Sequence, residues 1–212
     1  NSTVIPNGFE TEIFKPDSMA RSNIRKELGL QDHVFLVGRI ARYHPVKGHV
    51  TFLKAAAKLL KKKPDIFFLL AGRGINSCNQ QLQKIIDEND LKERVLLLDE
   101  RNDMPRLTAA LDIAVSSSGA ESFPNVLGEA MSCGIPCVVT DTGDSSIIVG
   151  DTGRVVPPQD AYSLACAIES LINEGPEELN RLGKAAREKI INNFSLQTIA
   201  KQYEKLYSKI LS

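Results

Sequence analysis

Hydrophobic residues gather into short continuous runs that alternate with longer amphipathic stretches. The apolar runs have the length of β-strands and lie at 34–41, 66–71, 94–98, 112–116 and 136–140, with a shorter one near 154–156. Helical spacing of apolar positions predicts helices at 17–30, 48–62, 77–89, 103–111, 124–133, 160–173, 176–191 and 195–211. Asp17 is placed to cap the first helix and Gly29 to end it.

Short apolar strands that are each followed by a helix indicate a parallel sheet covered on both faces. We therefore predict an α/β fold with a doubly wound, Rossmann-like parallel sheet. Such sheets bind ligands beyond the carboxyl ends of their strands. The segments that follow the predicted strands should therefore converge in space, namely 42–47, 72–74, 99–102, 116–125 and 140–145.

The composition is that of a globular chain with a core and without a global charge. Of 212 residues, 42% are hydrophobic and 25% are charged, and 26 basic residues balance 26 acidic ones. A zero net charge argues against nucleic acid as a partner. Four cysteines lack metal-ligand spacing, and we expect Cys133 and Cys137 to be small buried hydrophobic residues in a reducing compartment. Because no apolar run reaches the roughly 18 residues of a membrane span, we expect a cytoplasmic location.

The segment from Ser117 to Ala130 joins a strand to a helix through a turn of small residues. Pro124 is predicted at the first helical position, which leaves three amides pointing out of the helix start, those of Asn125, Val126 and Leu127. Their partial positive charge suits an anion. Glu121 lies just before the helix and Glu129 in its second turn, so the segment fits a nucleotide sugar, with phosphate in the middle and hydroxyl groups at both ends. The alternative is an ordinary amphipathic helix with one solvated glutamate.

A basic motif follows the first core strand. Arg42 and Lys47 flank a proline turn, so both can face one bound anion, the guanidinium as a planar fork and the ammonium as a mobile point charge. Each charge-assisted hydrogen bond adds about 1.5–3 kcal/mol, which makes micromolar affinity attainable without a metal. Arg39 ranks below these two as a phosphate ligand. His49 is expected to pack at a helix start rather than to touch phosphate.

Five motifs, taken in order, resemble those of glycosyltransferase family 4. They are Arg42-x4-Lys47-Gly48-His49, the stretch 98–105, the Glu121-x7-Glu129 motif, Thr140-Asp141-Thr142-Gly143-Asp144, and Gly150-Asp151-Thr152-Gly153. That family comprises retaining, nucleotide-sugar-dependent enzymes with two Rossmann-like domains, the GT-B architecture. The resemblance covers nearly the whole chain and implies the C-terminal, donor-binding half.

By this resemblance, Arg42 and Lys47 would hold the donor diphosphate together with the helix-start amides, those of Asn125, Val126 and Leu127. Glu129 would accept hydrogen bonds from both ribose hydroxyls, since a carboxylate can bridge a vicinal diol. Glu121 would be the catalytic residue, contacting hydroxyls of the transferred sugar near the developing oxocarbenium charge.

The resemblance implies further donor contacts. The loop 99–102, which includes Arg101, would face the base, and Phe123 belongs to the same substrate-binding set. Asp99 stands where the family often has glycine, which bears on the base contact. Ser146 stands where many members carry a glutamate. The chain has no Asp-x-Asp motif, so we expect positive side chains to replace a divalent ion, and no metal or other cofactor.

The resemblance also implies a domain organisation and partners. Residues 1–16 would be an entry or linker segment, 17–194 the donor-binding domain, and 195–212 a C-terminal helix that packs toward an N-terminal domain absent from this chain. The partners would be a UDP- or GDP-linked sugar, that N-terminal domain, and a lipid- or saccharide-linked acceptor in polysaccharide or glycolipid synthesis. Peripheral membrane contact would pass through the missing domain. Because the chain begins at Asn1 and lacks the acceptor side, we expect a hexosyltransferase fragment without efficient transfer.

Other classes of protein make demands that the sequence meets less well. A nicotinamide-dependent dehydrogenase needs Gly-x-Gly-x-x-Gly after its first strand, whereas Gly72-Arg73-Gly74 lacks the third glycine and follows a later strand. A phospho-accepting receiver needs clustered aspartates where this chain has Arg42. A nucleotide-sugar epimerase half and a non-catalytic nucleotide-binding module stay open as alternatives.

Overall fold

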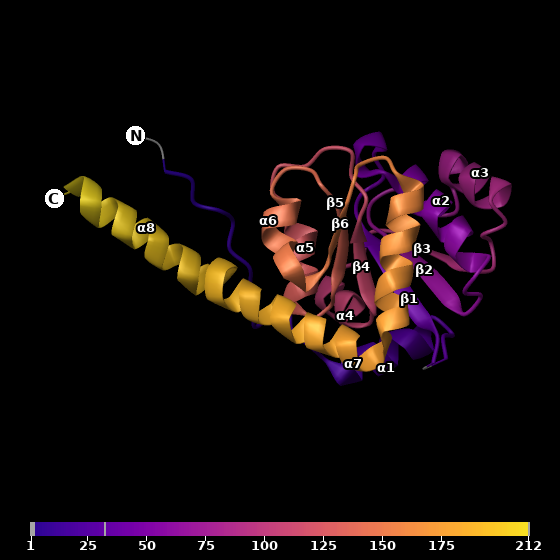
Figure 1. The fold of residues 1–212 in the computed structure, drawn as a ribbon, viewed down its shortest axis with the longest axis horizontal. Helices are drawn as coiled ribbons and strands as arrows, with labels where there is room; N and C mark the ends of the chain where they lie inside the picture. The colour runs from indigo at the N-terminus through magenta and orange to yellow at the C-terminus, as the bar shows by residue number, and fades with distance from the viewer. Residues whose placement is uncertain (1–2, 32, 212) are drawn as a thin grey trace.

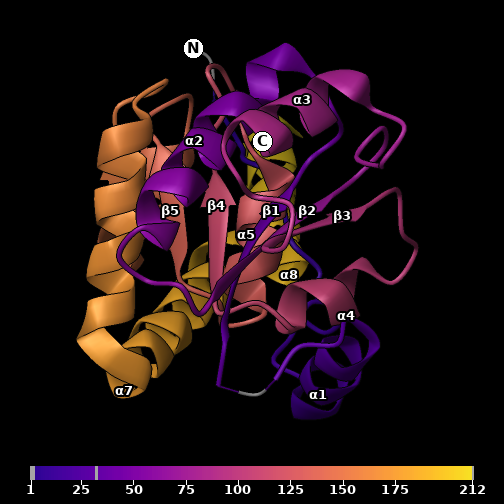
Figure 2. The same cartoon turned by 90° about the vertical axis from the view of Figure 1, so that its right-hand side faces the viewer.

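The apolar runs predicted as strands lie side by side in one parallel sheet. The computed structural model describes residues 3–31 and 33–211, and in these residues the sheet has six strands: β1 (Phe35–Ile40), β2 (Ile66–Ala71), β3 (Val95–Leu98), β4 (Ile113–Ser116), β5 (Cys137–Thr140) and β6 (Arg154–Val156). Their order is β3-β2-β1-β4-β5-β6, and Figure 2 shows the first five of these strands side by side. The predicted α/β, doubly wound class is confirmed. Because the strand order reverses between β1 and β4, the carboxyl ends of these two strands flank the usual ligand crevice.

Helices cover both faces of the sheet. One face packs against α2 (His49–Leu60), α3 (Gln80–Glu88) and the first part of α7 (Ala161–Phe194). The other face packs against α1 (Ser18–Glu27), α4 (Met104–Ala109), α5 (Asn125–Ser132), α6 (Ser145–Val149) and the last part of α7. Gly175 has φ 84° and ψ 171°, so α7 is broken between the two helices predicted at 160–173 and 176–191.

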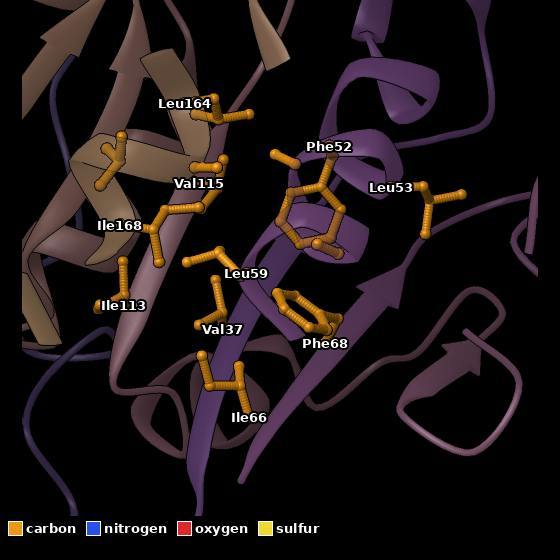
Figure 3. Packing of buried hydrophobic residues seen from close by; sticks show 14 of the residues in the cluster. Val37, Phe52, Leu53, Leu59, Ile66, Phe68, Ile113, Val115, Leu164 and Ile168 are labelled. Atoms are coloured by element: carbon orange, nitrogen blue, oxygen red, sulfur yellow. The ribbon is translucent and has the colours of Figure 1, made fainter. Parts of the chain in front are cut away.

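Alternate residues of the strands fill two separate cores. Val37 and Phe68 point into the cluster under α2 and α7, and their neighbours Leu36 and Leu69 point into the other cluster. In Figure 3, Phe68 meets Phe52 of α2 edge to face, with ring centroids 5.9 Å apart. Each large apolar side chain buried in this way contributes about 1.5–3 kcal/mol. The sheet is thus fixed from both sides, and the loops at its carboxyl edge project from a rigid base.

The two ends of the described chain leave the sheet on the same side. The helix α8 (Leu196–Leu211) projects away from the layered part of the molecule, and the segment 3–8 extends beside its base (Figure 1). Phe9 joins the two segments: its N–H donates to Phe194 O at 2.8 Å, and its carbonyl accepts from the Leu196 N–H at 3.1 Å. Residues 1, 2 and 212 of the predicted terminal segments lie outside the described residues.

Several local expectations need correction. The helix α6 and the 3₁₀ turns η1 (Pro45–Lys47) and η2 (Gly150–Thr152) were not predicted, because such short elements carry no periodic apolar pattern. The helix expected from residue 77 begins at Gln80, after Asn79 caps it by accepting the Leu82 N–H at 3.1 Å. Pro124 is not the first residue of α5 but its N-cap, with an extended backbone at φ −78° and ψ 102°.

Candidate functional site

A cavity of about 340 Å³ opens where β1 and β4 end. It brings together six of the residues predicted from sequence to bind the donor: Arg42, Lys47, Glu121, Phe123, Asn125 and Val126. The residues come from the loop after β1, the loop after β4 and the start of α5. The expected convergence of these segments is therefore confirmed, and the cavity lies at the crevice where doubly wound sheets bind ligands.

Lys47 and Glu121 form an ion pair inside this cavity. Lys47 Nζ lies 2.6 Å from Glu121 Oε1, and the two side chains are only 24% and 13% exposed. Ser118 Oγ donates a second hydrogen bond to the same carboxylate oxygen, at 2.7 Å. A phosphate that enters here meets an ammonium group already held by a carboxylate, so binding requires Lys47 to share or exchange its partner.

Arg42 offers a cation of a different kind. Its side chain is exposed on the loop after β1, and its guanidinium has no hydrogen-bond or ion-pair partner among residues 3–31 and 33–211. Its backbone is fixed, because the carbonyl accepts a hydrogen bond from His49 Nε2 at 3.0 Å. The site therefore has one cation in an ion pair and one whose fork is available for bidentate bonds to an anion.

The start of α5 supplies two free amides rather than the predicted three. The Leu127 N–H donates to Pro124 O at 3.1 Å, and Leu127 is buried away from the cavity. The amides of Asn125 and Val126 have no acceptor within the described ranges. The expectation for Leu127 is thus corrected: because Pro124 is the N-cap, a turn bond already uses the third amide.

Glu129 lies one helical turn after Asn125, on the same face of α5. It does not line the cavity itself, and its carboxylate accepts no hydrogen bond from the part of the chain that the structure describes. Burial raises the pKa of this half-buried side chain above its ordinary value of 4.5. A half-buried carboxylate without a donor costs free energy, and a ligand hydroxyl would satisfy it.

Arg39, which sequence reasoning ranked below Arg42 and Lys47 as a phosphate ligand, is bonded to other groups of the protein. It lines the cavity from β1 and is 1% exposed. Its guanidinium donates to Val115 O at 3.1 Å, to Ser118 Oγ at 3.1 Å, and to the carbonyl of Lys47. Burial lowers its pKa to about 10, which still leaves it charged at neutral pH. The available signal was an arginine within an otherwise apolar strand.

Arg101 lies outside the cavity. Its guanidinium bonds to both carboxylate oxygens of Asp103 at 2.8 Å and to Glu27 of α1 at 2.7 Å. These ion pairs raise its pKa further. Asp99, in the same loop, accepts from the Gly74 N–H at 3.0 Å and from Asn76 Nδ2 at 2.7 Å. The base-facing role of this loop stays a prediction, and the described contacts give its side chains structural partners.

A larger cavity, of about 590 Å³, lies at the opposite edge, beside the amino ends of β1, β4 and β5. Its acidic group is Asp112, which accepts from Arg21 at 2.6 Å, from Arg25 at 3.0 Å and from the Leu36 N–H at 2.7 Å. These bonds tie α1 to the sheet. The carboxylate of Asp112 is already paired with two guanidinium groups of the fold, so we do not assign the site there.

His49 is buried at the first position of α2, as the sequence predicted, and stacks on Tyr43 with ring centroids 5.5 Å apart. The carbonyl of Arg42 can only accept, so Nε2 carries the proton. Burial and the positive charges of Arg39 and Lys47 lower the pKa of His49 to about 4, against the opposing effect of the Arg42 carbonyl.

This pKa predicts acid sensitivity. The unfolded chain binds a proton at His49 near the ordinary value of 6.5 and the folded chain only near 4, so stability falls as the pH drops through that window. Between about pH 7 and about pH 4.5, we expect the free energy of unfolding to fall on the order of 1–3 kcal/mol more in the wild type than in His49→Gln. Urea titrations at several pH values measure the free energy of unfolding. If it falls equally with pH in the two proteins, the lowered pKa of His49 is contradicted.

The described residues hold neither a cluster of metal-ligating side chains nor a helix fit to cross a membrane. No three His, Cys, Asp or Glu side chains in residues 3–31 and 33–211 lie together as a metal site would require. In the same ranges, no helix combines the length and hydropathy of a membrane crossing. Cys133 and Cys137 are buried, as predicted, with exposures of 2% and 1%.

The comparisons with known proteins point to one family. Residues 20–189 match the family model described as glycosyl transferases group 1. The UDP-Gal:alpha-D-GlcNAc-diphosphoundecaprenol alpha-1,3-galactosyltransferase of Escherichia coli is 30% identical over 211 residues, which are 97% of this chain and 53% of that protein. The chain thus spans about half the length of the curated relatives it matches.

Solved structures agree. The chain is similar to a glycosyltransferase from Rickettsia africae, with a TM-score of 0.90, 23% identity, and coverage of 99% of this chain and 57% of that one. It is also similar to Anabaena Alr3699/HepE, solved in complex with UDP-glucose, with a TM-score of 0.87, 28% identity, and coverage of 98% and 57%. The fold matches the Rossmann-like C-terminal domains of GT-B glycosyltransferases.

Proposed function

The chain belongs to the glycosyl transferases group 1 family, and on that premise we propose that it is the donor-binding domain of a retaining, family 4 glycosyltransferase. The enzyme that contains this domain would move a sugar from a UDP- or GDP-linked donor to a hydroxyl of an acceptor. The observation that carries the proposal is the shared cavity, which Arg42, Lys47, Asn125 and Val126 all line. Related proteins named as transferases favour this function over an epimerase half or a non-catalytic module.

The diphosphate would occupy the cavity between the two cations. Arg42 would bind it with a planar fork, and Lys47 with a point charge. The amides of Asn125 and Val126 would donate from the positive end of α5. Arg39, which is already bonded to the Lys47 carbonyl and to Ser118, would hold these loops in place.

Glu121 would serve the transferred sugar. When Lys47 turns to phosphate, the Glu121 carboxylate loses its cationic partner and becomes free to accept from sugar hydroxyls. Its remaining negative charge would lie near the oxocarbenium character that develops at the anomeric carbon. In retaining transfer on one face of the sugar, the protein mainly positions the reactants, and its cations stabilise charge on the departing diphosphate.

The other half of the donor would extend along α5. Glu129 would accept from both ribose hydroxyls, which would supply the donors that its carboxylate lacks. The loop 99–102, including Arg101, would face the base through its backbone. Phe123 would border the cavity beside Glu121.

The domain organisation is part of the same proposal. Residues 17–194 would bind the donor, residues 1–16 would lead in from an N-terminal domain, and residues 195–212 would pack toward that domain. Support comes from α8, which exposes Tyr203, Tyr207, Ile210 and Leu211. A lipid- or saccharide-linked acceptor would bind mainly to the other domain, in the cytoplasm or at the membrane periphery. By itself the chain would bind a donor but transfer sugar inefficiently.

Calorimetric titration of the 212-residue chain with UDP, GDP and ADP, and with their sugar conjugates, tests the proposal. We expect one of these diphosphates to bind with a dissociation constant in the micromolar range. UMP should bind more weakly than UDP, because it brings fewer acceptors to the two cations. If the folded chain binds none of the diphosphates, the proposal is wrong.

Binding should not depend on a divalent ion. The cations of Arg42 and Lys47 take the place of a bridging metal in this proposal, so we expect the same dissociation constant for UDP in excess EDTA and in excess Mg²⁺. Titrations in the two buffers at matched ionic strength measure it. A large loss of affinity in EDTA would show that a metal takes part.

A further inference from the structure

The aromatic ring of Phe9 lies directly on the helix that carries the proposed donor contacts. A Cβ atom added at Gly128 of α5 would lie 2.2 Å from the ζ carbon of Phe9 and 2.3 Å from an ε carbon. Only glycine at residue 128 therefore lets the ring approach the helix backbone. Phe9 is 4% exposed, although it belongs to the extended segment before the first helix.

The same ring stacks on Phe123, between Glu121 and the helix start. The Phe9 and Phe123 centroids are 5.8 Å apart with an interplanar angle of 16°, and Phe123 meets Phe194 at 6.2 Å and 57°. Phe9 in turn is fixed through its backbone bonds to Phe194 and Leu196, at the junction of α7 and α8. The loop that bears Glu121 thus packs, through Phe123, on the ring of Phe9. The backbone of Phe9 is in turn hydrogen-bonded to the α7–α8 junction.

Two further contacts join the same segment to α5. Asn7 Nδ2 donates to Asn125 Oδ1 at 3.1 Å, at the first residue of the helix. Arg187 donates to Thr11 O at 3.2 Å and also to Ser132 O, at the last residue of the helix. The entry segment therefore contacts α5 at its start and its middle, and Arg187 of α7 links it to the end of the helix.

We propose that Phe9 is a positioning residue of the donor site. Its ring, held against Gly128 and stacked on Phe123, sets the direction of the first turn of α5 and the place of the loop with Glu121. The ring does not touch the cavity that Arg42 and Lys47 line, so it acts on the ligand only through these elements. The inference rests on the proposed function, because it concerns how well the α5 amides meet the diphosphate.

Phe9→Leu keeps an apolar side chain and removes the flat stack. We expect it to weaken UDP binding roughly tenfold, or about 1.4 kcal/mol, while Phe68→Leu leaves the affinity unchanged. Phe68 is the matched control, because it is also buried, at 0% exposure against 4% for Phe9, but packs in the other core cluster. Equal affinity in Phe9→Leu and the wild type would overturn the inference. If the wild type binds none of UDP, GDP and ADP, the proposed function itself fails.

A second variant separates positioning from stability. In Phe9→Ala the ring is gone, so the added Cβ of Gly128→Ala has room and raises the helix propensity of α5. We expect the double variant to recover thermal stability relative to Phe9→Ala but to keep its weak UDP binding. If affinity returns together with stability, Phe9 is merely structural and the inference is wrong.

Amide hydrogen exchange supplies a reciprocal readout. If Phe9 couples the junction to the donor site, UDP should slow exchange of the Phe9 and Leu196 amides in the wild type, and much less in Phe9→Leu. Exchange of the Phe68 amide, in β2, serves as the internal reference. Unchanged exchange at both junction amides in UDP-saturated wild type would contradict the coupling.

Discussion

Replacing Lys47 by glutamate should abolish measurable binding of UDP. The ammonium group would be lost from the cavity, and the new carboxylate would face Glu121 where Lys47 Nζ now lies 2.6 Å from Glu121 Oε1. Loss of a charge-assisted bond costs about 1.5–3 kcal/mol, and like-charge repulsion of the diphosphate adds to it. Together these effects predict a loss of more than about 100-fold, measured by calorimetric titration.

Two control variants show whether the loss of UDP binding comes from the charge at residue 47. Lys62→Glu reverses the charge of another paired lysine, 2.7 Å from Glu169, far from the cavity, and should leave UDP binding unchanged. Lys47→Met removes the charge without adding repulsion, and its loss should be smaller than that of Lys47→Glu. Circular dichroism must show that each variant is folded. If Lys47→Glu folds and still binds UDP as the wild type does, the diphosphate does not occupy this cavity.

Glu129→Ala should weaken ribonucleotides selectively. Two hydrogen bonds from the ribose hydroxyls to a carboxylate contribute about 1.5–3 kcal/mol each, so we expect UDP affinity to fall on the order of 100-fold or more. The affinity for 2′,3′-dideoxy-UDP, which cannot make these bonds, should change little. The two titrations on the same variant give the ratio, and equal losses for both ligands would exclude the ribose role.

The pH dependence of this ratio tests the same carboxylate. Burial raises the pKa of Glu129 above 4.5, so its charged form is lost earlier than usual as the pH falls. The preference for UDP over the dideoxy analogue should therefore decline on acidification in the wild type and stay flat in Glu129→Gln. A wild-type preference that is constant across the titration range of a carboxyl group would argue against an ionised Glu129 at the ribose.

The contribution of Glu129 to folding stability should depend on pH in the opposite way from its contribution to binding, and should be more favourable at low pH. The raised pKa means that the folded state favours the protonated form, and this stabilisation, present at low pH, is lost as the pH rises through the folded pKa. At neutral pH the ionised carboxylate destabilises the folded state, as is common for groups whose role is binding. Glu129→Gln should consequently fold at least as stably as the wild type while binding UDP more weakly.

Sequence reasoning predicted which charged residues gather at the carboxyl edge of the sheet. The strands were marked by apolar runs, and Arg42, Lys47 and Glu121 follow strands whose carboxyl ends meet. Sequence reasoning failed on how backbone groups are used. Pro124 is an N-cap and the Leu127 amide is already bonded, which depends on backbone angles that no residue pattern specified here.

The individual partners of charged groups were also hidden. Arg39 and Arg42 are three residues apart, yet one is buried against Val115 and Ser118 and the other is exposed. Arg101 seemed suited to a ligand, but Glu27 of α1 reaches it from 74 residues away. Such pairings arise only when helices pack against the sheet, because a long charged side chain can satisfy its charge with any neighbour within reach.

The sequence by itself determined the class of fold and the sheet edge at which Arg42, Lys47 and Glu121 gather, because strand length, helix period and the alternation of strands with helices are local properties of the chain. The tertiary structure alone decided that Lys47 is paired with Glu121 and that Phe9 rests on Gly128. Both contacts join segments distant in the chain. Their geometry follows from the close packing of β1, β4 and α5, which no local pattern encodes.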